Sequence, residues 1–348
     1  MSPPEPLRKP NRTQGRRIAK VAFWIAIAPV VLLALAWASL ALWFDGPSAR
    51  PFAGLPAGVF LVTAVGVLAR LRPRRRGLAL VGLTWLLVLG WWLLIAPSND
   101  RDWQPDVSRV PSATFAGDRV TIHNVRDFDY RSETDFTERW ENRTYDLNRI
   151  RGADLLLSYW GPTLIAHTIM SFEFEDGQHL PISIETRKEK GETYSALRGF
   201  FRQYELYYVV ADERDVVRLR TNYRGEQVFL YRLRGTPERA RAALQSYLDE
   251  VNRLAGQPQW YNALIHNCTT TIRTHVQEAG IHNPWNWRIL ANGKGDELLY
   301  RRKLIDTSLP FAEARARSDI TAKAHAADQD SAFSKRIRED LPPRPLEN

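Results

Sequence analysis

Three apolar runs occupy most of the first hundred residues and are separated by short polar segments. Residues 21–44 carry no charge over 24 positions, residues 51–69 carry none over 19, and residues 77–97 are again strongly apolar. About 20 apolar residues are enough to cross a bilayer as a helix. The pattern therefore predicts three transmembrane helices, of which the middle one is the shortest.

The charges around these runs are distributed unevenly. Residues 1–77 contain twelve Lys or Arg and two acidic residues, whereas the rest of the chain is nearly neutral although the total is +9. Basic flanks of membrane helices face the cytoplasm, so we expect residues 1–20 and 70–76 inside and everything after the third helix outside. A near-neutral remainder offers no footprint for phosphate backbones, and no nucleic-acid partner is expected.

Beyond residue 98 the pattern is that of a water-soluble domain. Residues 98–118 are polar and contain proline, which predicts a linker. Strands are predicted where apolar and aromatic residues dominate or alternate with polar ones, at 119–131, 154–160, 163–174, 178–187, 204–212 and 226–235.

Helices follow the strands. Thr236 and Pro237 are typical of a helix start, and a second helix is expected from Cys268 to about Ala279. Strands followed by helices indicate an α+β fold, an antiparallel sheet with helices packed on it. We assign the domain to residues 119–305, and expect the Ala-rich, charged tail 306–348 to be a loose helix or disordered.

The only cysteine of the chain, Cys268, begins the second of these helices. Asn267 is a favourable N-cap, which makes Cys268 the first helical residue. Free amides and the helix dipole at that end stabilise a thiolate, and the amides can also bind an oxyanion. The residue type and position suit a nucleophile. A buried cysteine that acts as a small apolar side chain is the alternative.

A nucleophilic cysteine needs a base, and His167 is the favoured candidate because it lies on an apolar strand. His275 is about 10 Å along the same helix, too far to reach, while His123 remains possible. Residues 175–177, Glu-Asp-Gly, suit a three-residue hairpin loop, which places His167 opposite Glu185. That carboxylate would orient the imidazole. A loop one residue longer or shorter would put Glu185 on the other face.

Four potential zinc ligands also cluster in sequence: His266, Cys268, His275 and His282. Their spacing matches no common ligand pattern, and one helix holds Cys268 and His275 too far apart for a single ion. No metal or other cofactor is expected.

Four segments resemble the Lnb N-terminal periplasmic domain family. They are "IHNVRDFDYR", "AHTIMSFEFEDGQHLPISIETRKEKGETYS", "YELYYVVADERD" and "YNALIHNCTTTI", and together they span roughly residues 120–284. The resemblance implies a circularly permuted papain-like fold related to the NlpC/P60 group, in which a strand histidine precedes the helix cysteine. It places the catalytic cysteine at Cys268, the histidine at His167 and the acidic position at Glu185. Asn267 has a supporting role, because as the N-cap it positions the start of the helix.

The same resemblance implies thiol-based acyl chemistry at the outer face of a bacterial inner membrane. The leading hypothesis is a membrane-anchored periplasmic acyltransferase that works through a thioester, with a phospholipid as acyl donor and a lipoprotein as acceptor. A hydrolase with the same site, acting as an amidase or peptidase of the cell envelope, is the first alternative. A non-catalytic binding domain with a buried Cys268 is the second. The sequence indicates no oligomeric state.

Overall fold

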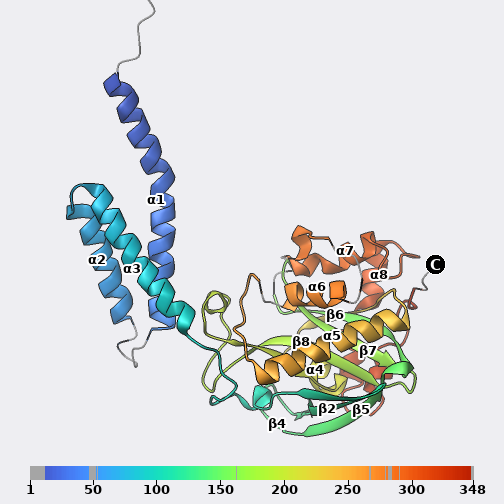
Figure 1. Ribbon diagram of the computed structural model, residues 1–348. Helices are drawn as coiled ribbons and strands as arrows, with labels where there is room; N and C mark the ends of the chain where they lie inside the picture. Colours follow the sequence, from blue (N-terminus) through green and yellow to red (C-terminus); the bar gives the residue numbers. More distant parts are fainter. Residues whose placement is uncertain are drawn as a thin grey trace, which may run out of the picture. The chain divides into compact units, whose positions relative to one another are not determined.

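The computed structural model describes residues 12–46, 52, 54–161, 163–265, 268–278, 280, 284–289 and 291–345. The chain divides into two compact units, Met1–Ala96 and Pro97–Asn348 (Figure 1).

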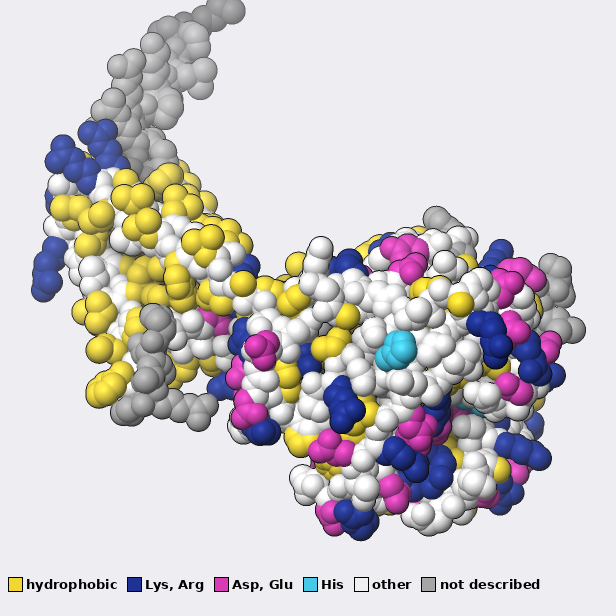
Figure 2. Space-filling view, turned by 60° about the horizontal axis from the view of Figure 1, so that its bottom comes forward, with side chains coloured by type: hydrophobic (Ala, Val, Ile, Leu, Met, Phe, Trp, Pro, Cys, Tyr) yellow, Lys and Arg dark blue, Asp and Glu magenta, His cyan; other side chains and the backbone are white. Residues whose placement is uncertain are grey.

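The first unit is a bundle of three helices, α1 (Arg12–Phe44), α2 (Leu55–Arg70) and α3 (Arg74–Leu94). Aromatic contacts join α1 to α3, since the ring of Trp37 contacts those of Trp85 and Trp92. The indole nitrogen of Trp92 also donates to Asp45 at 2.7 Å, just beyond the end of α1. The surface of the bundle is largely hydrophobic, and basic side chains gather at one of its ends (Figure 2).

Two of these helices are long and apolar enough to cross a membrane, α1 over Val21–Phe44 and α3 over Arg74–Leu94. Helix α2 has 16 residues, which corresponds to about 24 Å at 1.5 Å per residue. A hydrocarbon core is about 30 Å thick. Helix α2 is therefore shorter than the hydrocarbon core is thick, and its length does not confirm the prediction of a third membrane-spanning helix.

The second unit is built around a five-stranded antiparallel sheet with the strand order β10-β6-β7-β8-β9. Its strands are β6 (Ile150–Tyr159), β7 (His167–Phe174), β8 (His179–Arg187), β9 (Glu205–Val210) and β10 (Gln227–Arg232). A smaller sheet, β1-β2-β5, is formed by β1 (Ser112–Ala116), β2 (Arg119–Arg126) and β5 (Trp140–Asp146), and β3 (Asp129–Tyr130) pairs with β4 (Phe136–Thr137). The antiparallel sheet with packed helices agrees with the predicted α+β class; the circular permutation stays a prediction.

Helices cover both faces of the large sheet (Figure 1). One face packs on α5 (Pro237–Gly256) and α6 (Cys268–Glu278), which contribute Leu244, Leu248 and Ile272 to the larger core. The opposite face packs on α4 (Glu213–Arg218), α9 (Thr321–Ala326) and α10 (Phe333–Arg336). Two further helices, α7 (Gly295–Arg301) and α8 (Phe311–Ser318), complete the unit. Strands buried on both faces explain why their sequences are apolar almost throughout.

Two segments differ from expectation. Residues 98–118 are part of the folded unit, because Trp103 and Val107 are buried and β1 pairs with β2. Residues 306–345 also fold onto the sheet, where Phe333 and Ile337 are fully buried. Each fully buried side chain of this size stabilises the fold by about 1.5–3 kcal/mol, which offsets the polar composition of both segments.

Candidate functional site

The β7–β8 hairpin brings His167 and Glu185 together. Its strands pair in the predicted register, with Ile169 opposite Ser183 and Glu173 opposite His179. Gly177 closes the turn with a φ of +82°, a conformation that glycine adopts without strain. As a result, Nε2 of His167 lies 3.1 Å from Oε1 of Glu185. The predicted register is confirmed, and with it the proximity of the two side chains.

Ser183, two residues before Glu185 on β8, lies between them. Oγ of Ser183 is 2.6 Å from Nε2 of His167, and the Ser183 hydroxyl donates to Oε1 of Glu185 at 2.7 Å. Because that hydroxyl has one proton and gives it to Glu185, Nε2 of His167 must be the donor to Ser183. The imidazole is thereby held with its proton on Nε2 and its lone pair on Nδ1.

Arg220 completes the cluster by binding the carboxylate of Glu185. Its guanidinium donates to Oε1 of Glu185 at 2.7 Å and to Oε2 of Glu226 at 3.0 Å, and Ser158 also donates to Glu226. Burial raises the pKa of Glu185, but His167 in its charged form and Arg220 hold that pKa well below the usual range. Two carboxylates face one guanidinium, so a charged His167 would balance the cluster.

A π-helical turn places Arg220 in this position. Helix α4 continues into η4 (Leu219–Tyr223), where the wider winding replaces the regular helix. Such turns are frequent at functional sites because they redirect a side chain. Arg220 lies 35 residues from Glu185 in sequence, and no local pattern connects the two.

A cavity of about 850 Å³ opens beside this cluster. His167 and Glu185 line it, together with Trp160 and, from the first turn of α6, Thr269. The volume falls in the range of small-molecule sites, about 300–1,000 Å³. We call it the candidate pocket.

The start of α6 is tied to the start of β7 by one side chain, that of Asn292. Its amide nitrogen donates to Oγ1 of Thr269 at 2.7 Å and to the carbonyl oxygen of Ala166 at 2.5 Å, and its amide oxygen accepts from the backbone of Ala166 at 2.9 Å. Thr269 follows Cys268, and Ala166 precedes His167. Asn292 therefore holds the neighbours of the two predicted catalytic residues together.

The helix begins at Cys268 as predicted. The side chain of Cys268 lies outside the described part of the structure, as does the whole of Asn267. His167 projects to the sheet face that α4 covers, whereas α6 packs on the other face through Ile272. Because β7 begins at His167, the two faces meet at the end of this strand, and the candidate pocket lies there.

The family model of the Lnb N-terminal periplasmic domain matches residues 136–293, which include every residue of the cluster, the pocket residues named above and Cys268. The chain contains an Lnb N-terminal periplasmic domain. No curated protein and no solved structure matches the chain. The family and the two long apolar helices are consistent with a membrane-anchored periplasmic protein.

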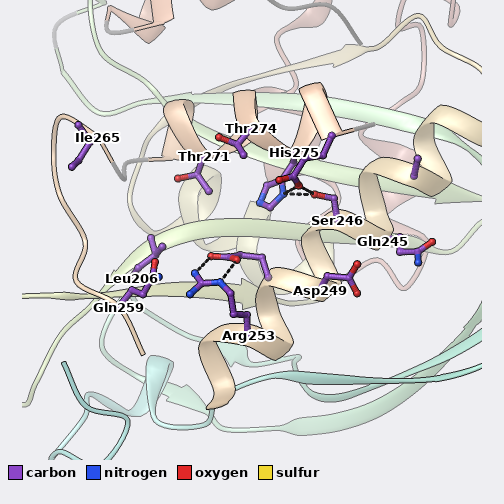
Figure 3. Close-up of a pocket in the computed structure, with 13 residues that line it drawn as sticks. Leu206, Gln245, Ser246, Asp249, Arg253, Gln259, Ile265, Thr271, Thr274 and His275 are labelled. Carbon is purple, nitrogen blue, oxygen red and sulfur yellow. Dashed lines mark hydrogen bonds and ion pairs between the residues drawn. The ribbon is translucent and has the colours of Figure 1, made fainter. Parts of the chain in front are cut away.

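The Lnb domain also contains a second cavity, of about 700 Å³, between α5 and α6 (Figure 3). His275 lines it and is buried, with Nε2 2.7 Å from the Tyr208 hydroxyl and Nδ1 2.6 Å from Ser246. Burial lowers the pKa of His275 to about 4, so the ring is neutral near pH 7. These contacts account for His275 as a buried, hydrogen-bonded residue.

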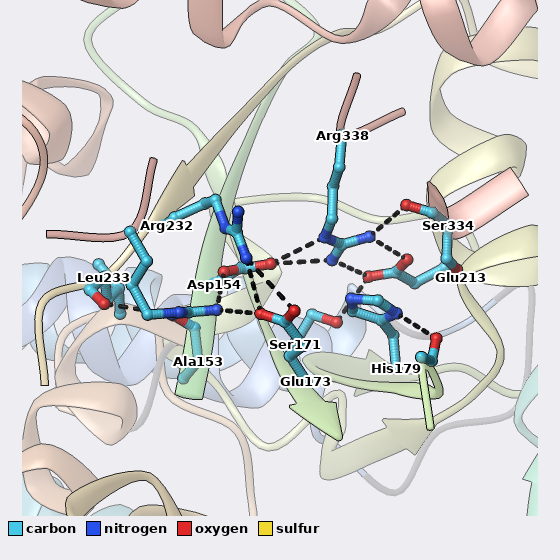
Figure 4. A network of polar contacts seen from close by, with 12 residues as sticks. Ala153, Asp154, Ser171, Glu173, His179, Glu213, Arg232, Leu233, Ser334 and Arg338 are labelled. Carbon is cyan, nitrogen blue, oxygen red and sulfur yellow. Dashed lines mark hydrogen bonds and ion pairs between the residues drawn. The ribbon is translucent and has the colours of Figure 1, made fainter. Parts of the chain in front are cut away.

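One group among the described residues has metal-ligand geometry, namely Asp154, Glu173 and His179. Its carboxylates already bind arginines (Figure 4): Arg344 contacts both Asp154 and Glu173, and Arg338 contacts Asp154. A cation there would have to displace these guanidinium groups. Of the four potential zinc ligands that cluster in sequence, His266 and His282 lie outside the described residues.

Proposed function

We propose that this protein is a membrane-anchored cysteine acyltransferase of the periplasm, with Cys268 as nucleophile, His167 as general base and then acid, and Glu185 as the orienting carboxylate. A phospholipid is the proposed acyl donor and a lipoprotein amine the proposed acceptor. The resemblance to the Lnb family suggests this chemistry, and the contacts of His167 support it.

The observation that carries the proposal is the hydrogen-bonded chain from His167 through Ser183 to Glu185. It fixes the proton on Nε2, so Nδ1 is the nitrogen that can take a proton from a thiol. The negative excess of the cluster stabilises the imidazolium that results. A base so oriented, in a pocket shared with the first turn of α6, is what a cysteine nucleophile requires.

The first step transfers the acyl group to the enzyme. His167 takes the proton of Cys268, and the thiolate attacks the ester carbonyl carbon of the phospholipid. The C–O bond then breaks, and the lysophospholipid alcohol leaves with the proton from His167, so a thioester remains. The amide of Cys268 at the helix start would stabilise the oxyanion.

The second step regenerates the thiol. An amine attacks the thioester carbonyl, His167 takes one proton from it, the C–S bond breaks and the thiolate recovers the proton. The products are an amide and free Cys268. If water replaces the amine, the product is a fatty acid and the protein is a hydrolase, the alternative function.

The proposed topology has three crossings, with residues 1–20 and 70–76 in the cytoplasm and the Lnb domain outside the inner membrane. A periplasmic domain after a cytoplasmic amino terminus needs an odd number of crossings, which favours a crossing by α2 although it is short. A reporter fused after Asn348 tests this: periplasmic activity is expected, and cytoplasmic activity would mean two crossings.

The deciding experiment is intact-mass analysis of the full protein in phospholipid nanodiscs, beside Cys268→Ser. An acyl mass that hydroxylamine removes is expected on the native protein and not on the variant. Thiol alkylation without an acyl adduct, together with fatty-acid release, would favour the hydrolase. A thiol that neither acylates nor reacts with iodoacetamide at neutral pH would refute both enzymes and leave a binding domain.

A further inference from the structure

The exposed large hydrophobic side chains of the second unit are not scattered. Among its described residues they all come from four loops. The first loop follows β6 and the second precedes β9; their exposed residues are Trp160, Leu164, Ile165, Tyr194, Leu197 and Phe200. Isolated exposed hydrophobics are common on soluble proteins, but their restriction to a few loops marks an interaction surface.

The other two loops flank α6. They expose Leu264 and Ile265 before the helix, and Trp285 and Trp287 after it. We call the ten exposed side chains of these four loops the apolar rim.

Backbone hydrogen bonds join the four loops in two pairs beside the candidate pocket. The amide of Ala263 donates to the carbonyl of Gly199 at 2.8 Å, and that of Gly293 donates to Leu164 at 3.0 Å. Rim side chains from two of the loops, including Trp160 and Phe200, line the pocket itself. Four of the ten rim side chains, those of Trp160, Ile165, Tyr194 and Phe200, therefore line the pocket beside His167.

The chain enters the second unit along the wall of the same pocket. The apolar helix α3 ends at Leu94, and the amide of Ser98 already donates to Glu205 at 3.1 Å. Four residues reach at most about 14 Å. A few residues later Gln104 lines the pocket, and its side chain donates to the carbonyl of Glu192 at 2.7 Å.

The composition of the rim favours lipid over a soluble protein as its occupant. Trp and Tyr, which supply four of the ten residues, are the side chains that concentrate at the boundary between headgroups and acyl chains. A face of the unit turned toward the viewer in Figure 2 carries mixed acidic and basic side chains instead. The tether between the apolar helix and the second unit is only a few residues long, which limits how far that unit can move from a bilayer surface.

We propose that the apolar rim inserts into the headgroup region of the bilayer that holds the N-terminal helices, so that the candidate pocket opens onto lipid. The insertion does not depend on acyl chemistry at Cys268. It would let a lipid-borne group enter the pocket laterally without crossing water.

The test uses the full protein in phospholipid nanodiscs that hold no other protein. Since Cys268 is the only cysteine, Cys268→Ser gives a background in which single cysteines are spin-labelled at Leu197→Cys, Leu264→Cys or Trp285→Cys. Two controls set the scale: Leu33→Cys on α1, which is 71% exposed, and Asp176→Cys in the exposed β7–β8 turn. The measurement is the ratio of label collisions with oxygen to collisions with a water-soluble nickel chelate.

We expect the rim positions to give a several-fold higher ratio than Asp176→Cys, approaching that of Leu33→Cys. Rim ratios equal to that of Asp176→Cys would refute insertion. Labels shielded from both reagents would indicate a second copy of the chain as the occupant and would also refute it. Because every labelled protein carries Cys268→Ser and so lacks the proposed nucleophile, failure of the proposed acyl chemistry cannot alter the result.

A second variant guards against a loop disturbed by its label. Leu197→Asp together with Leu264→Asp places two charges in the rim, and the label at Trp285→Cys then reports on one of the two unaltered loops. The ratio at this position should fall to the aqueous range, whereas Leu197→Met with Leu264→Met should preserve it. An unchanged ratio in the aspartate variant would show that the rim does not insert as a unit.

Discussion

Two clusters of charged side chains lie on the same face of the large sheet, one near each end, and they differ in what surrounds them. The cluster of His167 and Glu185 opens into a cavity of about 850 Å³. The cluster of Asp154, Glu173 and Glu213 is closed, because Arg232, Arg338 and Arg344 bind all three carboxylates (Figure 4).

The difference indicates which cluster can take part in a reaction and which one stabilises the fold. In the closed cluster three carboxylates face three guanidinium groups, and no charge is left to act on another molecule. In the open cluster, among the described side chains, two carboxylates form ion pairs with one guanidinium, that of Arg220, and a protonated His167 would supply a second positive charge. Both clusters are buried and contain ion pairs. Only the open cluster can be reached by another molecule and has a carboxylate charge that its guanidinium does not balance.

The largest expected effect is on the closed cluster. Arg338→Met leaves Asp154 and Glu213, both fully buried, without one of their cations. We expect the free energy of unfolding to fall by about 3–5 kcal/mol, as for other broken buried ion pairs. Denaturant unfolding measures this. Arg336→Met, which removes an exposed pair with Glu339, should cost less than about 1 kcal/mol; equal losses in both variants would contradict the distinction.

The open cluster should respond in reactivity rather than stability. If His167 is the base, the native thiol of Cys268 should alkylate rapidly even near pH 6, while His167→Asn should slow alkylation there by about a hundredfold or more and move the rise in rate toward about pH 8.5. The pH profile of iodoacetamide alkylation is the measurement. His123→Asn serves as the control, since the ring of His123 contacts Thr114 in the small sheet and does not line the candidate pocket. Identical profiles would remove His167 from the mechanism.

Acid should destabilise the closed cluster. Burial raises the pKa of Glu173, but the guanidinium groups of Arg344 and Arg232 outweigh this effect and hold that pKa at about 2. The unfolded state binds more protons between pH 4.5 and 2, so this stabilisation is complete above pH 4.5 and is lost as the pH falls to 2. A shift of this size corresponds to at most about 3 kcal/mol.

The comparison is between Glu173→Gln and the native protein. At pH 7 the variant should be less stable by up to about 3 kcal/mol, and the two unfolding free energies should converge toward pH 2. Glu175→Gln in the neighbouring turn, where Glu175 and its partner Arg149 are both about half exposed, should follow the native curve. A constant difference between native and Glu173→Gln at all pH values would rule out this titration.

The smallest effect is expected at Ser183. Ser183→Ala removes the bridge to His167, but Glu185 remains 3.1 Å from Nε2 and can hold the tautomer directly. One lost hydrogen bond of about 0.5–1.5 kcal/mol corresponds to about a tenfold slower alkylation at most. The same alkylation assay applies, with Ser183→Thr, which keeps the hydroxyl, as the control. A loss as large as that of His167→Asn would make Ser183 the orienting group in place of Glu185.

The parts of the site that sequence could predict are those that neighbouring residues determine. Gly177 and the length of the turn set the hairpin register, and the register places Glu185 beside His167. Arg220 and Asn292 were missed because each reaches the site from a distant segment through tertiary packing. Their local sequences, one in a π-helical turn and one at the start of a three-residue 3-10 helix, give no periodic signal.

The fold was predictable where strands are apolar throughout, and less so where few apolar residues are spread among charges. Residues 306–345 look disordered in composition, yet Phe333 and Ile337 are fully buried against the sheet. Arg338 and Arg344 also look like solvent-exposed charges, and only the carboxylates on β6, β7 and α4 explain their burial. The number of charged residues in a segment does not show which of them form ion pairs with buried carboxylates.

The closed cluster also constrains the order in which the segments of the domain can fold. Asp154 and Glu213 are synthesised more than a hundred residues before Arg338 and Arg344, and all four meet only when the later segment has emerged. If the domain is exported as an extended chain with its amino terminus leading, the sheet face around these carboxylates must wait for that segment to arrive. Formation of the ion pairs of Arg338 and Arg344 would then be the last step of folding, and a domain without residues 338–344 would not complete its fold.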